Sequence, residues 1–145
     1  MSSSIQFKLR RGKKRPDSDF ADLLKESANR ITFGVFDNTR LLAIVSVTRD
    51  KRKKVNHKGC ISSMYVLASY RGKGLGKQLL AHALEFADSQ SKLVQLTLVV
   101  NTTNTSAISL YESFGFKMFG IEPFAAVING IPQEQMHMVR LKVDR

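Results

Sequence analysis

Three glycines fall within residues 71–76, where a strand-like pattern ends and a helix-like pattern begins. Residues 59–67 have the pattern of a strand, and residues 93–100 form a near-continuous apolar run, which is typical of a buried central strand. Between them the apolar residues recur at helical spacing on one face: Leu75, Leu79, Ala83 and Phe86. Because such a helix must cross one face of a sheet, this unit predicts an α/β sandwich built on a mixed sheet.

The rest of the chain adds more strands around that unit. Alternating or β-branched segments predict strands at 5–9, 31–36, 41–47, 117–128 and 133–143. The second and third form a hairpin at Asp37-Asn38, and the last two form one at Asn129-Gly130, a strong turn dipeptide. Helical spacing also predicts a helix after the capping residues 17–19 and a short helix at 107–114.

Length and composition favour one domain, residues 1–145. The chain has 145 residues, 43% of them hydrophobic, which supports one core and is too short for two ordinary domains. The longest purely apolar run, 41–45, is far shorter than a membrane-spanning helix requires, and the first eight residues have no signal-peptide core. With one cysteine, Cys60, an intrachain disulfide is excluded, and we expect a reducing, cytoplasmic location.

The charge is strongly positive and uneven. The formal net charge is +11, and the first 60 residues carry 15 Lys and Arg against 6 Asp and Glu. Two basic clusters, 10–15 and 51–54, dominate this excess, and we expect both to be solvated loops. Neither cluster has interleaved aromatic residues on which bases stack, so we do not expect nucleic acid as a partner.

The glycine-rich turn indicates a site for a pyrophosphate. Glycines let a ligand approach the backbone closely, and a helix N-terminus offers unpaired N–H donors with a partial positive charge. Arg71, Lys73 and Lys77 add full charges around the same turn. The spacing matches neither the dinucleotide fingerprint G-x-G-x-x-G nor the P-loop G-x-x-x-x-G-K-[ST].

Two motifs in the correct order resemble one family. Arg71-x-x-Gly74-x-Gly76 after a strand is similar to the Arg/Gln-x-x-Gly-x-Gly/Ala signature of the GCN5-related N-acetyltransferases (GNAT). About 30 residues downstream, a second segment resembles that family's asparagine-to-LYE..GF motif: Asn104-x-x-Ala107-x-x-Leu110-Tyr111-Glu112-x-x-Gly115-Phe116. The element order predicted over essentially the whole chain agrees with that family.

The resemblance implies both a fold and an activity. The fold would be a mixed, mostly antiparallel sheet of about six to seven strands with helices on both faces, splayed between the strand before the glycine loop and the next strand. The activity would be acetyl transfer from acetyl-CoA to a primary amine of a small molecule or peptide, by direct attack in a ternary complex. A homodimer through the late strands is a further expectation, and neither a membrane nor a metal is implied.

By the same resemblance, the cofactor-binding residues come from three places. Val66 would polarise the thioester carbonyl through its amide, and Asn104 and Tyr111 would contact the cofactor from the short helix. Asn104 has a second interpretation as a plain helix N-cap. The full set of expected cofactor-binding residues is Met64, Val66, Arg71, Gly72, Lys73, Gly74, Leu75, Gly76, Lys77, Asn104 and Tyr111.

The catalytic acid is expected to be Tyr111, because a phenol stays protonated at neutral pH and can donate to a leaving thiolate. The base is less defined: residues 61–64 offer no carboxylate, which leaves Glu122 and Glu134 as candidates. Three scattered histidines and one cysteine give no metal-ligand spacing. The alternative function is a catalytically inactive GNAT-fold basic module that binds nucleic acid or a protein partner.

Overall fold

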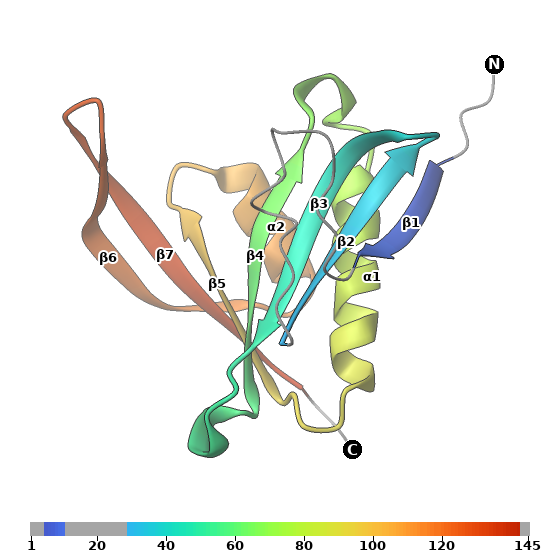
Figure 1. Ribbon diagram of the computed structural model, residues 1–145. Helices are drawn as coiled ribbons and strands as arrows, with labels where there is room; N and C mark the ends of the chain where they lie inside the picture. Colours follow the sequence, from blue (N-terminus) through green and yellow to red (C-terminus); the bar gives the residue numbers. More distant parts are fainter. Residues whose placement is uncertain (1–4, 11–28, 143–145) are drawn as a thin grey trace.

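The computed structural model describes residues 5–10 and 29–142, and of residues 5–10 the backbone alone (Figure 1). The helix expected after residues 17–19 and most of the basic cluster 10–15 lie outside the described residues. The described elements are β1 (Ile5–Arg10), β2 (Arg30–Asp37), β3 (Arg40–Arg49), η2 (Lys53–Val55), β4 (Lys58–Val66), η3 (Ala68–Tyr70), α1 (Leu75–Ser89), β5 (Gln95–Asn101), α2 (Thr105–Ser113), β6 (Lys117–Ile128) and β7 (Ile131–Leu141).

The strands form one seven-stranded sheet in the order β1-β2-β3-β4-β5-β7-β6. Every neighbouring pair is antiparallel except β4 and β5, which run parallel. Those two strands pair only where Lys58–Cys60 lies beside Gln95–Thr97. Beyond Cys60 they diverge, so the sheet opens into a V that is closed at its foot (Figure 1). The splayed, mixed and mostly antiparallel sheet expected from the sequence is therefore confirmed.

The tight turns follow from local backbone chemistry. Asn129 and Gly130, between β6 and β7, have φ of 52° and 76°, the left-handed values that a two-residue hairpin turn requires. Asn38 likewise has positive φ between β2 and β3. The last hairpin turns where the sequence predicts it, whereas the first turns at Asn38-Thr39, one residue later than predicted, because Asp37 still pairs with Arg40. Asn and Gly adopt the left-handed conformation at low cost.

The main core lies between the sheet and the two α-helices. The buried face of α1 carries Leu79, Leu80 and Ala83, each with no exposed surface, and it packs chiefly on β3 and β2. Residues of α2, including Tyr111, belong to the same buried cluster, so both described α-helices lie on one face of the sheet (Figure 1). We call this the helix face.

The other side of the sheet, which we call the opposite face, has its own buried residues. Phe36, Leu41 and Ile44 form a small separate cluster there. Beside them Thr32 and Ser46 are buried and share a hydrogen bond of 2.8 Å between their hydroxyls. Alternation along the strands therefore places an apolar set on the helix face and a partly polar set on the opposite face.

One bulge interrupts the pairing of β3 with β4. The register skips between Ile44 and Ser46, and Ser63 in β4 has φ of 56°. A bulge adds a residue to one strand and turns the strand beyond it. The last residues of β4 thereby reach the glycine-rich turn.

Among the described residues, no helix combines the length and apolar composition that crossing a membrane requires.

Candidate active site

The glycine-rich turn opens α1 as the sequence predicts. Gly72 and Gly74 have φ of 77° and 81°, a conformation that residues with a Cβ adopt only with strain. Gly74 is the N-cap of α1 and has no side chain to cap the helix. The first helical hydrogen bond runs from the Gln78 amide to the Gly74 carbonyl at 3.0 Å. The amides of residues 75–77 come before this bond and have no acceptor within the helix. Such free amides donate hydrogen bonds to an anion bound at a helix N-terminus.

A cavity of about 540 Å³ lies between this turn, the end of β4 and α2. We call it the mouth pocket, because it lies where the V is open. Its walls come from segments up to 47 residues apart in the chain, from residue 64 to residue 111. Its lining residues are Met64, Tyr65, Val66, Tyr70, Arg71, Gly72, Gly74, Leu75, Gly76, Lys77, Asn104, Ser106, Ala107, Leu110 and Tyr111.

The backbone of the turn leaves room for a ligand. A Cβ built on Gly72 or Gly74 meets nothing within 4 Å, so that space is open to an incoming group. A Cβ on Gly76 would lie 3.3 Å from Cε of Met64 and 3.7 Å from Cγ2 of Val66, where α1 approaches β4 closely. Gly76 therefore sets how near the helix N-terminus lies to the strand.

Three cations surround the turn, and two of them line the mouth pocket. Arg71 donates from Nε to the Val66 carbonyl at 2.9 Å and lies 5.4 Å from the centre of the Tyr65 ring. Lys77 lines the pocket, whereas Lys73 does not and instead lies 5.3 Å from the centre of the Tyr70 ring. With no acid in the lining, the pocket carries net positive charge, which suits a phosphate-bearing ligand.

Asn104 is the N-cap of α2, as one of its two interpretations expects, and it also lines the mouth pocket. Its Oδ1 accepts hydrogen bonds from the Ala107 amide at 3.2 Å and from the Ser106 hydroxyl at 3.3 Å. An asparagine here satisfies a free amide of the first helical turn.

Tyr111 lies two turns further along α2, with its ring in the core. The residue is 7% exposed, and its ring meets Phe116 edge-on with 6.0 Å between ring centres. Burial raises the pKa of the Tyr111 phenol above its ordinary value. Within the described part of the chain no group hydrogen-bonds its hydroxyl, and the residue lines the mouth pocket. A protonated phenol at a pocket wall is suited to proton donation.

The two candidate carboxylates lie on the β6–β7 hairpin, outside the lining of the mouth pocket. Glu122 is half-exposed and makes a 2.9 Å contact from Oε1 to Nε2 of His137. Glu134 is exposed, and its backbone carbonyl accepts from the Thr102 amide at 3.1 Å. His137 pairs with Val99 of β5, so the Glu122–His137 pair lies on the opposite face of the sheet.

Cys60 and the histidines have no catalytic arrangement in the described residues. Burial raises the pKa of the Cys60 thiol, which disfavours the nucleophilic thiolate. His82 meets the ring of Phe33 edge-on at 5.9 Å, as a packing residue does. Over residues 29–142, no group of three or more potential ligands is placed to hold a metal ion.

Part of the pocket wall was not predicted from the sequence. Tyr65 and Tyr70 line it and lie against cations, and Leu110 and Ala107 of α2 complete its apolar side. Alternation along β4 gave no signal for Tyr65, because it places Tyr65 on the face opposite to Met64 and Val66. The proximity of α1 to α2 had no local signal, because it depends on how both helices cross the sheet.

Comparisons with known proteins agree on one family. The family model described as "Acetyltransferase (GNAT) family" matches residues 4–116. A peptidyl-lysine N-acetyltransferase, YjaB of Salmonella typhimurium, is 37% identical over 60 residues, which is 41% of this chain and 37% of the relative. Streptothricin acetyltransferase of Streptomyces lavendulae is 31% identical over 88 residues, 61% of this chain and 45% of the relative. The chain thus matches less than half the length of these curated relatives.

Solved structures are similar over most of the chain. A GNAT-family acetyltransferase from Streptococcus pneumoniae has a TM-score of 0.76 and 34% identity, covering 86% of this chain and 74% of that one. The ribosomal-protein-S18-alanine N-acetyltransferase of Escherichia coli has a TM-score of 0.79 at 18% identity, covering 98% and 96%, which shows a shared fold.

Proposed function

Because the chain belongs to the GNAT acetyltransferase family, we propose that it transfers an acetyl group from acetyl-CoA to a primary amine by direct attack in a ternary complex. We also propose that residues 1–145 act as one such domain. The observation that supports this function most is the mouth pocket. It combines backbone amides at a helix N-terminus, two cations and a buried phenol with a raised pKa at the open end of the V.

The residues of the turn fit the phosphates of the cosubstrate. The amides of residues 75–77 and the backbone of Gly72 and Gly74 would donate to a pyrophosphate, while Arg71 and Lys77 would neutralise it. Open space at the Cβ positions of both glycines supports this fit. Acetyl-CoA supplies the activated acyl group when bound, and the proposal assigns no role to a metal.

The thioester end of the cosubstrate would lie near the end of β4. Beyond Cys60 the facing edges of β4 and β5 are not paired with each other, so backbone groups there can hold an extended arm. The Val66 amide would polarise the carbonyl that is attacked, and Asn104 would position the arm from α2. Met64 and Leu75 would enclose the arm through their apolar side chains.

Proton transfers need one donor and one acceptor. Tyr111 is the proposed acid, which would protonate the departing thiolate from its hydroxyl. Glu122 and Glu134 remain the proposed bases, acting through water, because neither lines the mouth pocket. The contact with His137 distinguishes the two glutamates, because it holds Glu122 in place on the opposite face. No described residue hydrogen-bonds or pairs with the Glu134 side chain.

Two properties of the whole molecule are proposed with this function. The first is a homodimer through β6, an edge strand with a row of exposed apolar side chains, which favours association. These include Met118, Phe119, Ile121, Phe124, Val127 and Ile128. Sedimentation would test it. The second is a cytoplasmic location, supported by a lone free thiol, Cys60.

Acetyl-CoA binding and turnover test the proposal together. Acetyl-CoA should raise the melting temperature, because it binds the folded state alone. Free thiol should then appear when amines are added.

The alternative, an inactive basic module, is motivated by the net charge of +11. It predicts salt-sensitive nucleic-acid binding with no thermal shift by acetyl-CoA.

A further inference from the structure

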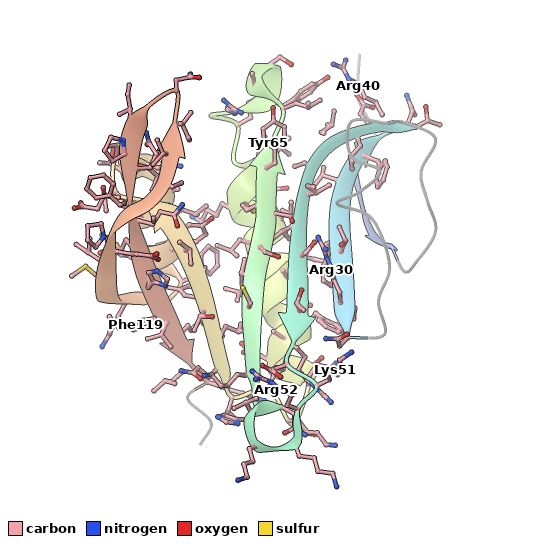
Figure 2. All side chains as sticks on the ribbon, turned by 60° about the vertical axis from the view of Figure 1, so that its left-hand side comes forward. Arg30, Arg40, Lys51, Arg52, Tyr65 and Phe119 are labelled. Carbon is pink, nitrogen blue, oxygen red and sulfur yellow. The ribbon has the colours of Figure 1, made fainter. Side chains whose placement is uncertain are left out.

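A second cavity of about 420 Å³ lies at the other end of β4, where β4 and β5 are still paired. We call it the foot pocket. In Figure 2, Lys51 and Arg52 lie at this end of β4, and Tyr65 lies at the far end. The lining residues of the foot pocket are Asn29, Thr48, Arg49, Asp50, Lys51, Arg52, Lys58, Gly59, Cys60 and Thr97. It shares no lining residue with the mouth pocket.

Positive charge dominates the foot pocket. Its lining has four cationic residues, Arg49, Lys51, Arg52 and Lys58, against one acid, Asp50. Arg52 donates to both carboxylate oxygens of Asp50, from Nε at 3.0 Å and from Nη2 at 2.8 Å. These hydrogen bonds, and to a lesser degree the charge of Lys58, lower the pKa of Asp50 to about 2. Within the described residues, no ion pair engages the other three cations.

The foot pocket lies on the opposite face of the sheet. Thr48 pairs with Cys60, and Cys60 pairs with Thr97, so these three side chains share one face. Ser46 pairs with Ser62 on that same face, while Val47 and Ile61 point into the main core. The floor of the foot pocket is therefore made of hydroxyl and thiol groups, with Lys51, Arg52 and Lys58 beside it, while Arg49 reaches it from the helix-face side of β3.

Small polar side chains connect the two pockets along β4. Beyond Cys60, Ser62 and Ser63 occupy the opposite face before Met64 and Val66 reach the mouth pocket. Arg30 of β2 reaches across β3 and donates from Nη2 to the Ser63 hydroxyl at 3.2 Å. A strand rises about 3.3 Å per residue, so the distance from Cys60 to Val66 is about 20 Å. That is the length of about six residues of an extended peptide.

We propose that the foot pocket binds an acidic side chain of an extended peptide acceptor, about five or six residues from the amine that is acetylated. This inference rests on the proposed acetyltransferase function and specifies its substrate class. A small amine is too short to reach both pockets. No aromatic residue lines the foot pocket, so nucleic-acid bases would find no stacking partner there, which favours a peptide.

The test compares two peptides and two double variants. The peptides are Ser-Ala-Ala-Ala-Glu-Glu-Gly-Trp amide and the same sequence with Gln-Gln in place of Glu-Glu. The test variant is Lys51→Gln with Lys58→Gln, which removes two lining charges. The matched control is Lys53→Gln with Lys54→Gln, which removes the same charge from the adjacent turn, outside both pockets. Alaninamide serves as an acceptor too short to reach the foot pocket.

Binding is measured separately from turnover. The protein contains no tryptophan, so fluorescence anisotropy of the peptide tryptophan reports peptide binding alone. We expect wild type and control to bind and acetylate the Glu peptide about tenfold better than the Gln peptide, as a few solvent-exposed ion pairs allow. In the test variant the preference should fall below about twofold, and in the wild type it should shrink in high salt. Turnover of alaninamide should be equal in all three proteins.

Three results would overturn the inference. The first is equal affinity of the wild type for both peptides. The second is a control variant that loses the preference as fully as the test variant does. The third is that a single-stranded DNA of ten nucleotides binds the wild type but not the test variant, while neither protein prefers the Glu peptide. That outcome would assign the foot pocket to nucleic acid. Absence of acetyl-CoA binding in calorimetry would instead reject the proposed function, while anisotropy would still decide what the foot pocket binds.

Discussion

Replacing Tyr111 by phenylalanine separates its chemical role from its structural role. The ring is buried against Phe116, and phenylalanine keeps that packing. The hydroxyl hydrogen-bonds no described residue, so its removal breaks no bond in that part of the fold. We therefore expect the free energy of unfolding of Tyr111→Phe to stay within about 0.5 kcal/mol of the wild type.

The effect on chemistry should be far larger. Loss of a general acid lowers kcat by roughly 100-fold, which corresponds to about 2.7 kcal/mol at 25 °C. Because burial raises the pKa of Tyr111, the acid stays protonated across neutral pH. Activity of the wild type should not fall through ionisation of this group until the pH exceeds about 10.

The assay is single-turnover release of free thiol at saturating acetyl-CoA and acceptor, so that product release does not mask the chemical step. Calorimetry should show nearly unchanged acetyl-CoA affinity, and thermal unfolding should show a folded variant. Tyr70→Phe is the comparison, because its ring and the Lys73 contact persist, and its kcat should change by less than about threefold. A stable, cofactor-binding Tyr111→Phe protein with near wild-type kcat would refute the assignment and leave solvent as the proton source.

Three further outcomes are expected. Arg71→Ala should weaken acetyl-CoA binding about tenfold by calorimetry, since a phosphate partner is lost, and change acceptor KM less; an unchanged acetyl-CoA affinity would contradict this. Lys53→Ser with Lys54→Ser should leave turnover of a small acceptor within about threefold, because both side chains lie outside the mouth pocket, and a large loss would place that turn at the active site. Asp88→Asn should lower stability at pH 7 by about 1 kcal/mol, discounted for solvent exposure, because Asp88 forms a bidentate pair with Arg140 at 2.9 Å. That hydrogen bonding lowers the pKa of Asp88 in the folded protein. The stabilisation by the pair is therefore fully present above pH 3.8, the pKa in the unfolded chain, and is lost as the pH falls through the lower pKa of the folded protein. A difference in thermal unfolding between Asp88→Asn and wild type that persists below that lower pKa would disprove the role of the pair.

Most elements could be predicted from the sequence because their signals are local. The apolar run that becomes β5 and the helical spacing from Leu75 give the unit around which the sheet forms. Asn129-Gly130 places the last hairpin at its exact turn, and the bounds of β6 agree with the prediction. The other elements differ from prediction by a few residues at their ends, where pairing across the sheet, rather than pattern, decides which residues join a strand.

The candidate site was predictable in part. Glycines at 72, 74 and 76 are needed by the local backbone and by the close approach of α1 to β4, so the turn shows in the sequence. The order of the two motifs then identified the family. The hairpin that carries Glu122 and Glu134 was predicted, but the position of both residues outside the lining of the mouth pocket carried no sequence signal. Side-chain direction there depends on the bulges in the β6–β7 register.

The sequence by itself determined the strand–glycine turn–helix–strand unit, the two hairpins and the net positive charge, because each depends on neighbouring residues or on a sum over the chain. Only the tertiary structure decided which cavities the positively charged residues line. Residues 49–52 and Lys58 enclose one cavity because β3, β4 and β5 meet at the foot of the V. Met64 and Tyr111 reach a common pocket because the divergence of β4 from β5 brings α2 beside the end of β4. Contacts between residues so far apart in the chain depend on how strands and helices cross, which no local pattern records.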